Sequence, residues 1–121
     1  MSDLPLMARA QREARRRGHR FVSTAHVLLG ALADPGDPLG ARLRALGEDL
    51  EARIEATLPP AGPATEDALP FAPNVRDALE HALAHATEAG RLEIRAEDLL
   101  QGLARTAGSR AARVLRDPGR P

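Results

Sequence analysis

The sequence predicts an all-α fold. Hydrophobic residues make up 43% of the 121 positions, which is enough for a buried core, and Ala and Leu dominate them. Ala and Leu are strong helix formers, whereas the aromatic residues that favour strands are limited to Phe21 and Phe71. The chain also matches itself without a gap at one constant offset, which places Gly18 on Gly90. These observations predict one four-helix motif used twice, a pseudo-twofold double repeat.

Glycines carry most of the evidence for the repeat. Four pairs share the same offset: Gly18 with Gly90, Gly30 with Gly102, Gly36 with Gly108 and Gly47 with Gly119. Glycine marks chain positions where other residues are strained, so the pairs indicate the same turns in the same order. Alanine pairs such as Ala10 with Ala82 carry less weight, because an Ala-rich chain produces them by chance.

The first predicted helix covers roughly residues 4–17. Ser2 or Asp3 can cap its N-terminus, and Pro5 sits in its first turn, where a missing N–H costs little. Gly18 ends it.

Three further helices are predicted in the first copy, which spans residues 1–58. Apolar residues at helical spacing mark each of them. The sets are Val27, Leu28, Ala31 and Leu32, after a cap at Ser23 or Thr24; Leu39, Leu43 and Leu46, after the turn at 34–38; and Leu50, Ile54 and Leu58, after a break at Gly47.

Residues 59–70, rich in Pro, Ala and Gly, predict a linker within a single domain of residues 1–121. The second copy, 71–117, holds a helix that Gly90 ends, a helix around Leu99, Leu100 and Leu103, and a helix around Ala111, Val114 and Leu115. It lacks a fourth helix. We therefore expect an exposed apolar patch around Val114 and Leu115, and self-association or a partner there.

Composition excludes several kinds of chemistry. All 17 basic residues are Arg, and they balance 17 acidic residues, so net charge gives no support to nucleic-acid binding. Without Lys or Cys there is no Walker-type phosphate loop, Schiff base, thiolate nucleophile or Cys-ligated metal. We predict no catalysis, no cofactor and no membrane span, and a cytoplasmic location.

Two clusters have a functional and a structural interpretation. His81 and His85 share a helix face and could hold zinc, but no further ligand stands at a recognisable spacing, so we expect a solvated face and no metal site. The arginines from Arg9 to Arg20 could follow phosphates or a partner's acidic surface. A solvated helix face near a helix C-terminus, where cations suit the dipole, explains Arg15 to Arg17 without any ligand. His19 and His26 are expected to serve structure, bonding backbone near a turn.

Four segments resemble the N-terminal domain that precedes the ATPase rings of Clp-type AAA+ protein unfoldases. Residues 18–32, GHRFVSTAHVLLGAL, are similar to its first signature, and residues 69–79, LPFAPNVRDAL, to the start of its second repeat. Residues 94–103, followed by 111–115, resemble the remainder. The resemblance implies a double helical repeat that does no chemistry and passes substrate proteins and adaptors to the ATPase ring.

The resemblance also implies candidate ligand residues. The positions of Phe71, Arg76 and Leu79 line a surface that binds cyclic peptide antibiotics in actinobacterial relatives, although Phe71 could instead plug the joint between the repeats. Some relatives recognise phosphoarginine through an acidic residue, kept here only as Glu97, because the first copy has Ala25 at the matching position. The Thr that precedes the proline of the second repeat is replaced by Ala72.

The leading functional hypothesis is a binding module that engages a Clp-type ATPase, its adaptor or proteins marked for degradation. The alternative is a sequestering protein that binds cyclic peptide antibiotics aimed at the unfoldase. A helical DNA-binding regulator is a third, more distant hypothesis.

Overall fold

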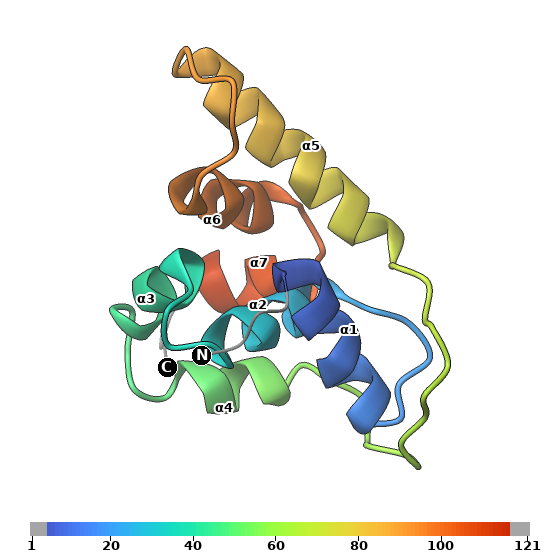
Figure 1. The fold of residues 1–121 in the computed structure, drawn as a ribbon. Coiled ribbons are helices and arrows are strands. Elements are labelled where there is room, and N and C mark those ends of the chain that lie inside the picture. Colours follow the sequence, from blue (N-terminus) through green and yellow to red (C-terminus); the bar gives the residue numbers. More distant parts are fainter. Residues whose placement is uncertain (1–4, 117–121) are drawn as a thin grey trace.

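The computed structural model describes residues 5–116, and within them every regular element is a helix (Figure 1). The predicted all-α class is confirmed. The helices are α1 (Leu6–Arg16), α2 (Thr24–Leu32), α3 (Pro38–Arg44), α4 (Leu50–Glu55), α5 (Pro73–Glu88), α6 (Ala96–Arg105) and α7 (Arg110–Arg116). The expected caps Ser2 and Asp3 lie outside the described residues; Pro5 stands at the N-cap of α1. No helix in this part of the chain is long and apolar enough to cross a membrane.

Helix α2 is the centre of the fold. It packs against α1, α3, α4 and α7, and every residue from Thr24 to Ala31 is buried. A helix that is apolar on all sides must be enclosed on all sides, and the neighbouring helices do this. Helices α5 and α6 form a second pair that projects from this core (Figure 1).

The same geometry recurs at the offset found in the sequence. Helices α2 and α6 begin at Thr24 and Ala96, and α3 and α7 begin at Pro38 and Arg110. Helix α1 ends before Gly18, with φ +73°, and α5 ends before Gly90, with φ +79°. Both glycines occupy the left-handed region that other residues avoid, so the prediction that they share a turn is confirmed.

One predicted glycine pair does not share a turn. Gly108 has φ +78°, whereas Gly36 has no positive φ. The reason is the side chain of Asp34, whose Oδ1 accepts the N–H of Gly36 at 3.0 Å and holds the turn in another conformation.

A close helix crossing is the strongest link between the two copies. A Cβ added to Gly30 of α2 would stand 2.8 Å from the backbone N of Ala10 in α1. A Cβ added to Gly102 of α6 would stand 2.8 Å from the backbone N of Ala82 in α5. The paired alanines and glycines of the sequence therefore form the same contact twice, with one backbone resting on the other.

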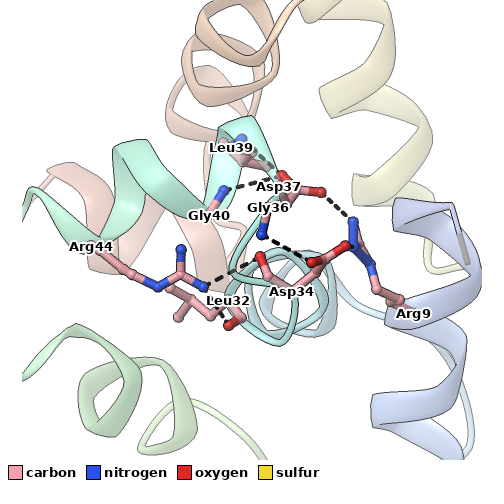
Figure 2. A network of polar contacts seen from close by, with 8 residues as sticks. All are labelled: Arg9, Leu32, Asp34, Gly36, Asp37, Leu39, Gly40 and Arg44. Atoms are coloured by element: carbon pink, nitrogen blue, oxygen red, sulfur yellow. Dashed lines mark hydrogen bonds and ion pairs between the residues drawn. The ribbon is translucent and has the colours of Figure 1, made fainter. Parts of the chain in front are cut away.

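A buried arginine ties α1 to the turn after α2 (Figure 2). The guanidinium of Arg9 donates to Asp34 at 3.0 Å and to Asp37, and Asp37 also accepts the N–H groups of Leu39 and Gly40 at the start of α3. Arg9, the first arginine of the basic stretch, is therefore bound inside the fold and is not presented to a ligand. Its charge is buried because two carboxylates face it.

The predicted apolar patch at the second copy is also wrong for Val114, which is only 4% exposed. Helix α4 of the first copy packs against α7, and Arg53 of α4 donates to the carbonyl oxygen of Val114 at 2.8 Å. Leu115 is partly buried against the core. The fourth helix of the first copy thus covers helix two of its own copy and helix three of the other. The stop predicted at 117–119 lies outside the described residues.

The segment 59–70 runs alongside α1 and is hydrogen-bonded to it. Gly62 N–H donates to the Arg17 carbonyl at 2.8 Å, and the Gln11 side chain exchanges two hydrogen bonds with the backbone of Leu69. The segment has no helix, yet its backbone is tied to α1 at both ends. It therefore holds the second copy at a defined place.

Replacing Gly30 with Ala tests the close crossing. Helix propensity alone predicts a gain of about 1 kcal/mol, because Ala is the better helix former. The contact with Ala10 predicts a net loss of roughly 2 kcal/mol, because a backbone must move. Urea unfolding followed by circular dichroism measures the sign.

Ala84→Gly on the exposed side of α5 is the matched control and should lose about 1 kcal/mol through propensity alone. A Gly30→Ala variant as stable as the parent protein would show that the crossing is not close.

Candidate functional site

Phe71 lies where the linker meets the second copy. Its neighbours pair with the loop before α2: Val22 N–H donates to the Pro70 carbonyl at 2.9 Å, and Ala72 N–H donates to the Val22 carbonyl at 2.8 Å. The Phe71 side chain is 45% exposed. The backbone therefore closes the joint between the copies, while the ring faces solvent with nearly half its surface.

The other predicted residues fall into two places. Arg76 is exposed and Leu79 is partly buried, and both lie in the first half of α5, which follows Phe71. Glu97 lies at the start of α6, 3.6 Å from the Arg91 guanidinium, and lines a separate hollow of about 560 Å³ with Leu6. The four residues do not form one site.

The second aromatic residue, Phe21, was not among the predicted site residues. It is 43% exposed and directly precedes Val22, which is bridged to Phe71. The chain's two aromatic side chains thus both stand in solvent on the two segments that meet at the joint. Their scarcity in the sequence was the available signal.

A buried histidine pair lies beside Phe21. The Ser23 N–H donates to His26 Nδ1 at 2.8 Å, so Nδ1 is unprotonated and the neutral ring carries its proton on Nε2. His26 Nε2 then donates to His19 Nδ1 at 2.8 Å, and His19 Nε2 donates to the carbonyl of Pro59 at 3.1 Å. The predicted structural use of both residues is confirmed, and all four ring nitrogens are engaged.

The pKa of His26 is lowered to about 4. Burial is the main cause, and the nearby His19, Arg17 and Arg110 add to it because each disfavours a second positive charge. A protonated His26 would also lose the acceptor that holds the Ser23 N–H. The pair is therefore a neutral brace between α2, the loop before it and the linker.

The second copy has a matching hydrogen-bond network, in which charged side chains replace the two histidines. Asp98, which takes the place of His26 in the second copy, is fully buried, and its carboxylate accepts the N–H of Arg95 at 2.7 Å. It also accepts from Arg91 and from His85 Nδ1. The Arg91 bond is the main reason that the pKa of Asp98 lies well below its usual range.

His85 therefore does not belong to a solvated histidine face, and that expectation is wrong for it. The ring is held against Asp98 of the neighbouring helix, whereas His81 is exposed. Across residues 5–116, no three His, Cys, Asp or Glu side chains gather as metal ligands would.

The architecture is that of an all-helical domain in which one motif occurs twice. The sequence profile of the Clp repeat (R) N-terminal domain matches residues 5–117. The chain belongs to this family of Clp N-terminal domains.

Relatives support the assignment. The chain is 36% identical over 114 residues to the ATP-dependent Clp protease ATP-binding subunit ClpA homolog of Brassica napus chloroplasts, and equally to the chloroplastic chaperone protein ClpC1 of Arabidopsis thaliana. Each match covers 91% of this chain but only 13% and 12% of the relative. The chain thus spans about an eighth of the length of these proteins.

Solved structures show the same fold. The N-terminal domain of the caseinolytic protease associated chaperone ClpD from Arabidopsis thaliana aligns with a TM-score of 0.64 at 24% identity, over 92% of this chain and 80% of that one. A chain from a study of a malarial protein secretion system aligns with a TM-score of 0.73 at 16% identity, over 93% and 78%.

The histidine brace predicts a pH dependence of stability. Because the pKa of His26 is about 4 in the fold and about 6.5 in an unfolded chain, its contribution is complete above pH 6.5 and is lost as pH falls towards 4. The loss amounts to roughly 2 to 3 kcal/mol. Urea unfolding at pH 7.5 and pH 4.5 measures it.

His26→Gln is the control, because Gln keeps an acceptor for the Ser23 N–H but does not titrate. This variant should be less stable at pH 7.5 and should lose less on acidification. An equal loss of stability in both proteins would contradict the assignment.

Proposed function

We propose that this chain is a non-catalytic docking module that binds substrate or adaptor proteins of a Clp-type ATPase. Membership of the Clp N-terminal domain family supports this role. The observation that carries it is the pair of exposed phenyl rings, Phe21 and Phe71, at the joint between the copies. Exposed aromatic residues are costly in a free protein and are common anchors in interfaces.

The proposed contact surface starts at Phe71 and continues over Arg76 and Leu79. Residues three apart on a helix lie on neighbouring positions of its surface, so Arg76 and Leu79 offer a charge and an apolar side chain side by side. Arg76 makes no ion pair among the described residues, so its guanidinium is available to a partner. An extended polypeptide with apolar and acidic side chains complements this surface.

Glu97 is proposed as a second, separate contact. Its carboxylate is partly exposed beside the hollow that Leu6, Ile94 and Arg42 also line. A basic group of a partner fits there, in competition with Arg91 at 3.6 Å.

The relatives described above are chaperones and ATP-binding subunits, so they give no support to an antibiotic-sequestering role. Their names place them in chloroplasts, and the cytoplasmic location expected for this chain stays a prediction.

Binding to an unfolded protein tests the proposal. Fluorescein-labelled β-casein should bind saturably, as measured by fluorescence anisotropy. Phe71→Ala and Arg76→Ala should each weaken binding about fivefold or more, which corresponds to roughly 1 kcal/mol. Both side chains are exposed, so the variants should keep the parent's circular dichroism and urea midpoint.

Glu88→Ala, at the far end of α5, is the matched control and should bind normally. Unchanged binding by both site variants would remove Phe71 and Arg76 from the surface, and no casein binding by the parent would contradict the docking role. If Phe71→Ala unfolds the protein while Arg76→Ala binds normally, Phe71 is structural.

A further inference from the structure

A hollow of about 250 Å³ lies beside the histidine brace, away from Arg76 and Leu79. Its walls are the loop before α2, the start of the linker and the first residue of α7. The lining residues that matter below are Arg20, Phe21, Pro59, Pro60 and Arg110.

The charge of this hollow has one sign. Among residues 5–116, Arg20 and Arg110 line it and no acidic residue does. Within the described part of the chain Arg20 has no acidic partner, and Arg110 donates only to the carbonyl of Thr57. Two guanidinium groups without a carboxylate are the complement of an anion.

The histidines do not supply the recognition. Each ring nitrogen of His19 and His26 is engaged by the brace or by backbone, so neither ring has a free donor or acceptor for a ligand. The two rings form a neutral floor. The contacts open to an anion are therefore those of the two arginines.

The remaining walls are apolar. Phe21 and two adjacent prolines, Pro59 and Pro60, surround the arginines. A phosphate or sulfate ion would leave the apolar walls exposed to water. A carboxylate that carries a short apolar group would contact both the arginines and the apolar walls. The volume is below the range of ordinary small-molecule sites, and suits a single terminal residue.

The hollow has a continuation. A second hollow of about 150 Å³ shares Phe21, Ser23 and Arg110 with it and adds Asn74 and Arg113. A small carboxylic acid that fills the first hollow has no further atoms to place in the second. A peptide whose last residue fills the first hollow has its preceding residue at the second, next to the amide of Asn74.

We propose that the hollow between the loop before α2, the linker and α7 binds the C-terminal residue of a peptide, with its carboxylate on Arg20 and Arg110 and its apolar side chain against Phe21, Pro59 and Pro60. This assignment rests on the proposed peptide-binding function and adds to it the chemical class of the bound end. Capture of a terminal carboxylate is a known mode of peptide recognition.

The experiment compares two octapeptides with fluorescein at the N-terminus, six Gly and Ser residues, and Leu-Leu at the end. One has a free carboxylate and the other is amidated. By anisotropy, the free acid should bind at least tenfold more tightly, and its affinity should fall as salt is raised, because the contact is between charges. N-acetylleucine should compete only weakly.

Arg20→Gln should reduce the affinity of the free acid at least fivefold and leave the amide unchanged. Arg20 is exposed and unpaired in the described structure, so this variant should fold normally. Arg110→Gln should act in the same direction. Arg105→Gln, an exposed arginine at the end of α6 that lines neither of the two hollows, is the matched control and should bind both peptides as the parent does.

The outcomes separate this assignment from the proposed function. If labelled casein binds but the two octapeptides bind equally, or Arg20→Gln binds the free acid normally, the carboxylate site is wrong and the docking role stands. If N-acetylleucine binds as tightly as the octapeptide, the site takes small acids and the peptide assignment is overturned. If neither casein nor the octapeptide binds, both proposals fail.

Discussion

The fold depends on how closely helix one of each copy rests on helix two. At Gly30 and at Gly102 the facing helix backbone occupies the space where a side chain would begin. This contact allows short Ala-rich helices to bury their faces without large side chains, since dispersion contacts grow as the backbones approach. It also explains why the core of this chain needs no buried aromatic ring. Both phenyl rings remain available for other contacts.

The sequence predicted those features of the fold that depend on residues close together in the chain. The helix ends at Gly18 and Gly90 and the cap at Ser23 follow from the conformational freedom of glycine and from local hydrogen bonding, which act within a few residues. The burial of Arg9 was missed because its carboxylate partners stand 25 and 28 residues away. The cover over Val114 was missed for a related reason: α4 belongs to one copy but packs against a helix of the other, and spacing within a copy cannot show this.

The candidate site shows the same division. The sequence offered Phe71, Arg76 and Leu79 as candidates through resemblance, and the structure places Arg76 and Leu79 in the first half of α5, directly after Phe71. Glu97 was grouped with them but stands at another hollow. The substitution of His26 by Asp98 between the copies was visible, but its meaning was not. Both side chains accept the N–H of the residue three before them, so one backbone requirement is met by a neutral base and by an anion.

That difference in charge changes what each copy can present to a partner. In the second copy Asp98 needs Arg91, so this arginine is consumed inside the fold, and Glu93 replaces Phe21 at the equivalent loop position. In the first copy the neutral His19–His26 pair needs no counterion, which leaves Arg20 unpaired beside it in the described structure. Pro59 and Pro60 of the linker form walls of the hollow beside Arg20. The linker occurs once in the chain, so the second copy has no equivalent prolines among the described residues. A repeated backbone thus carries two different surfaces at this loop: the first copy has the exposed ring of Phe21 beside an unpaired Arg20, and the second has the carboxylate of Glu93 at the position that matches Phe21.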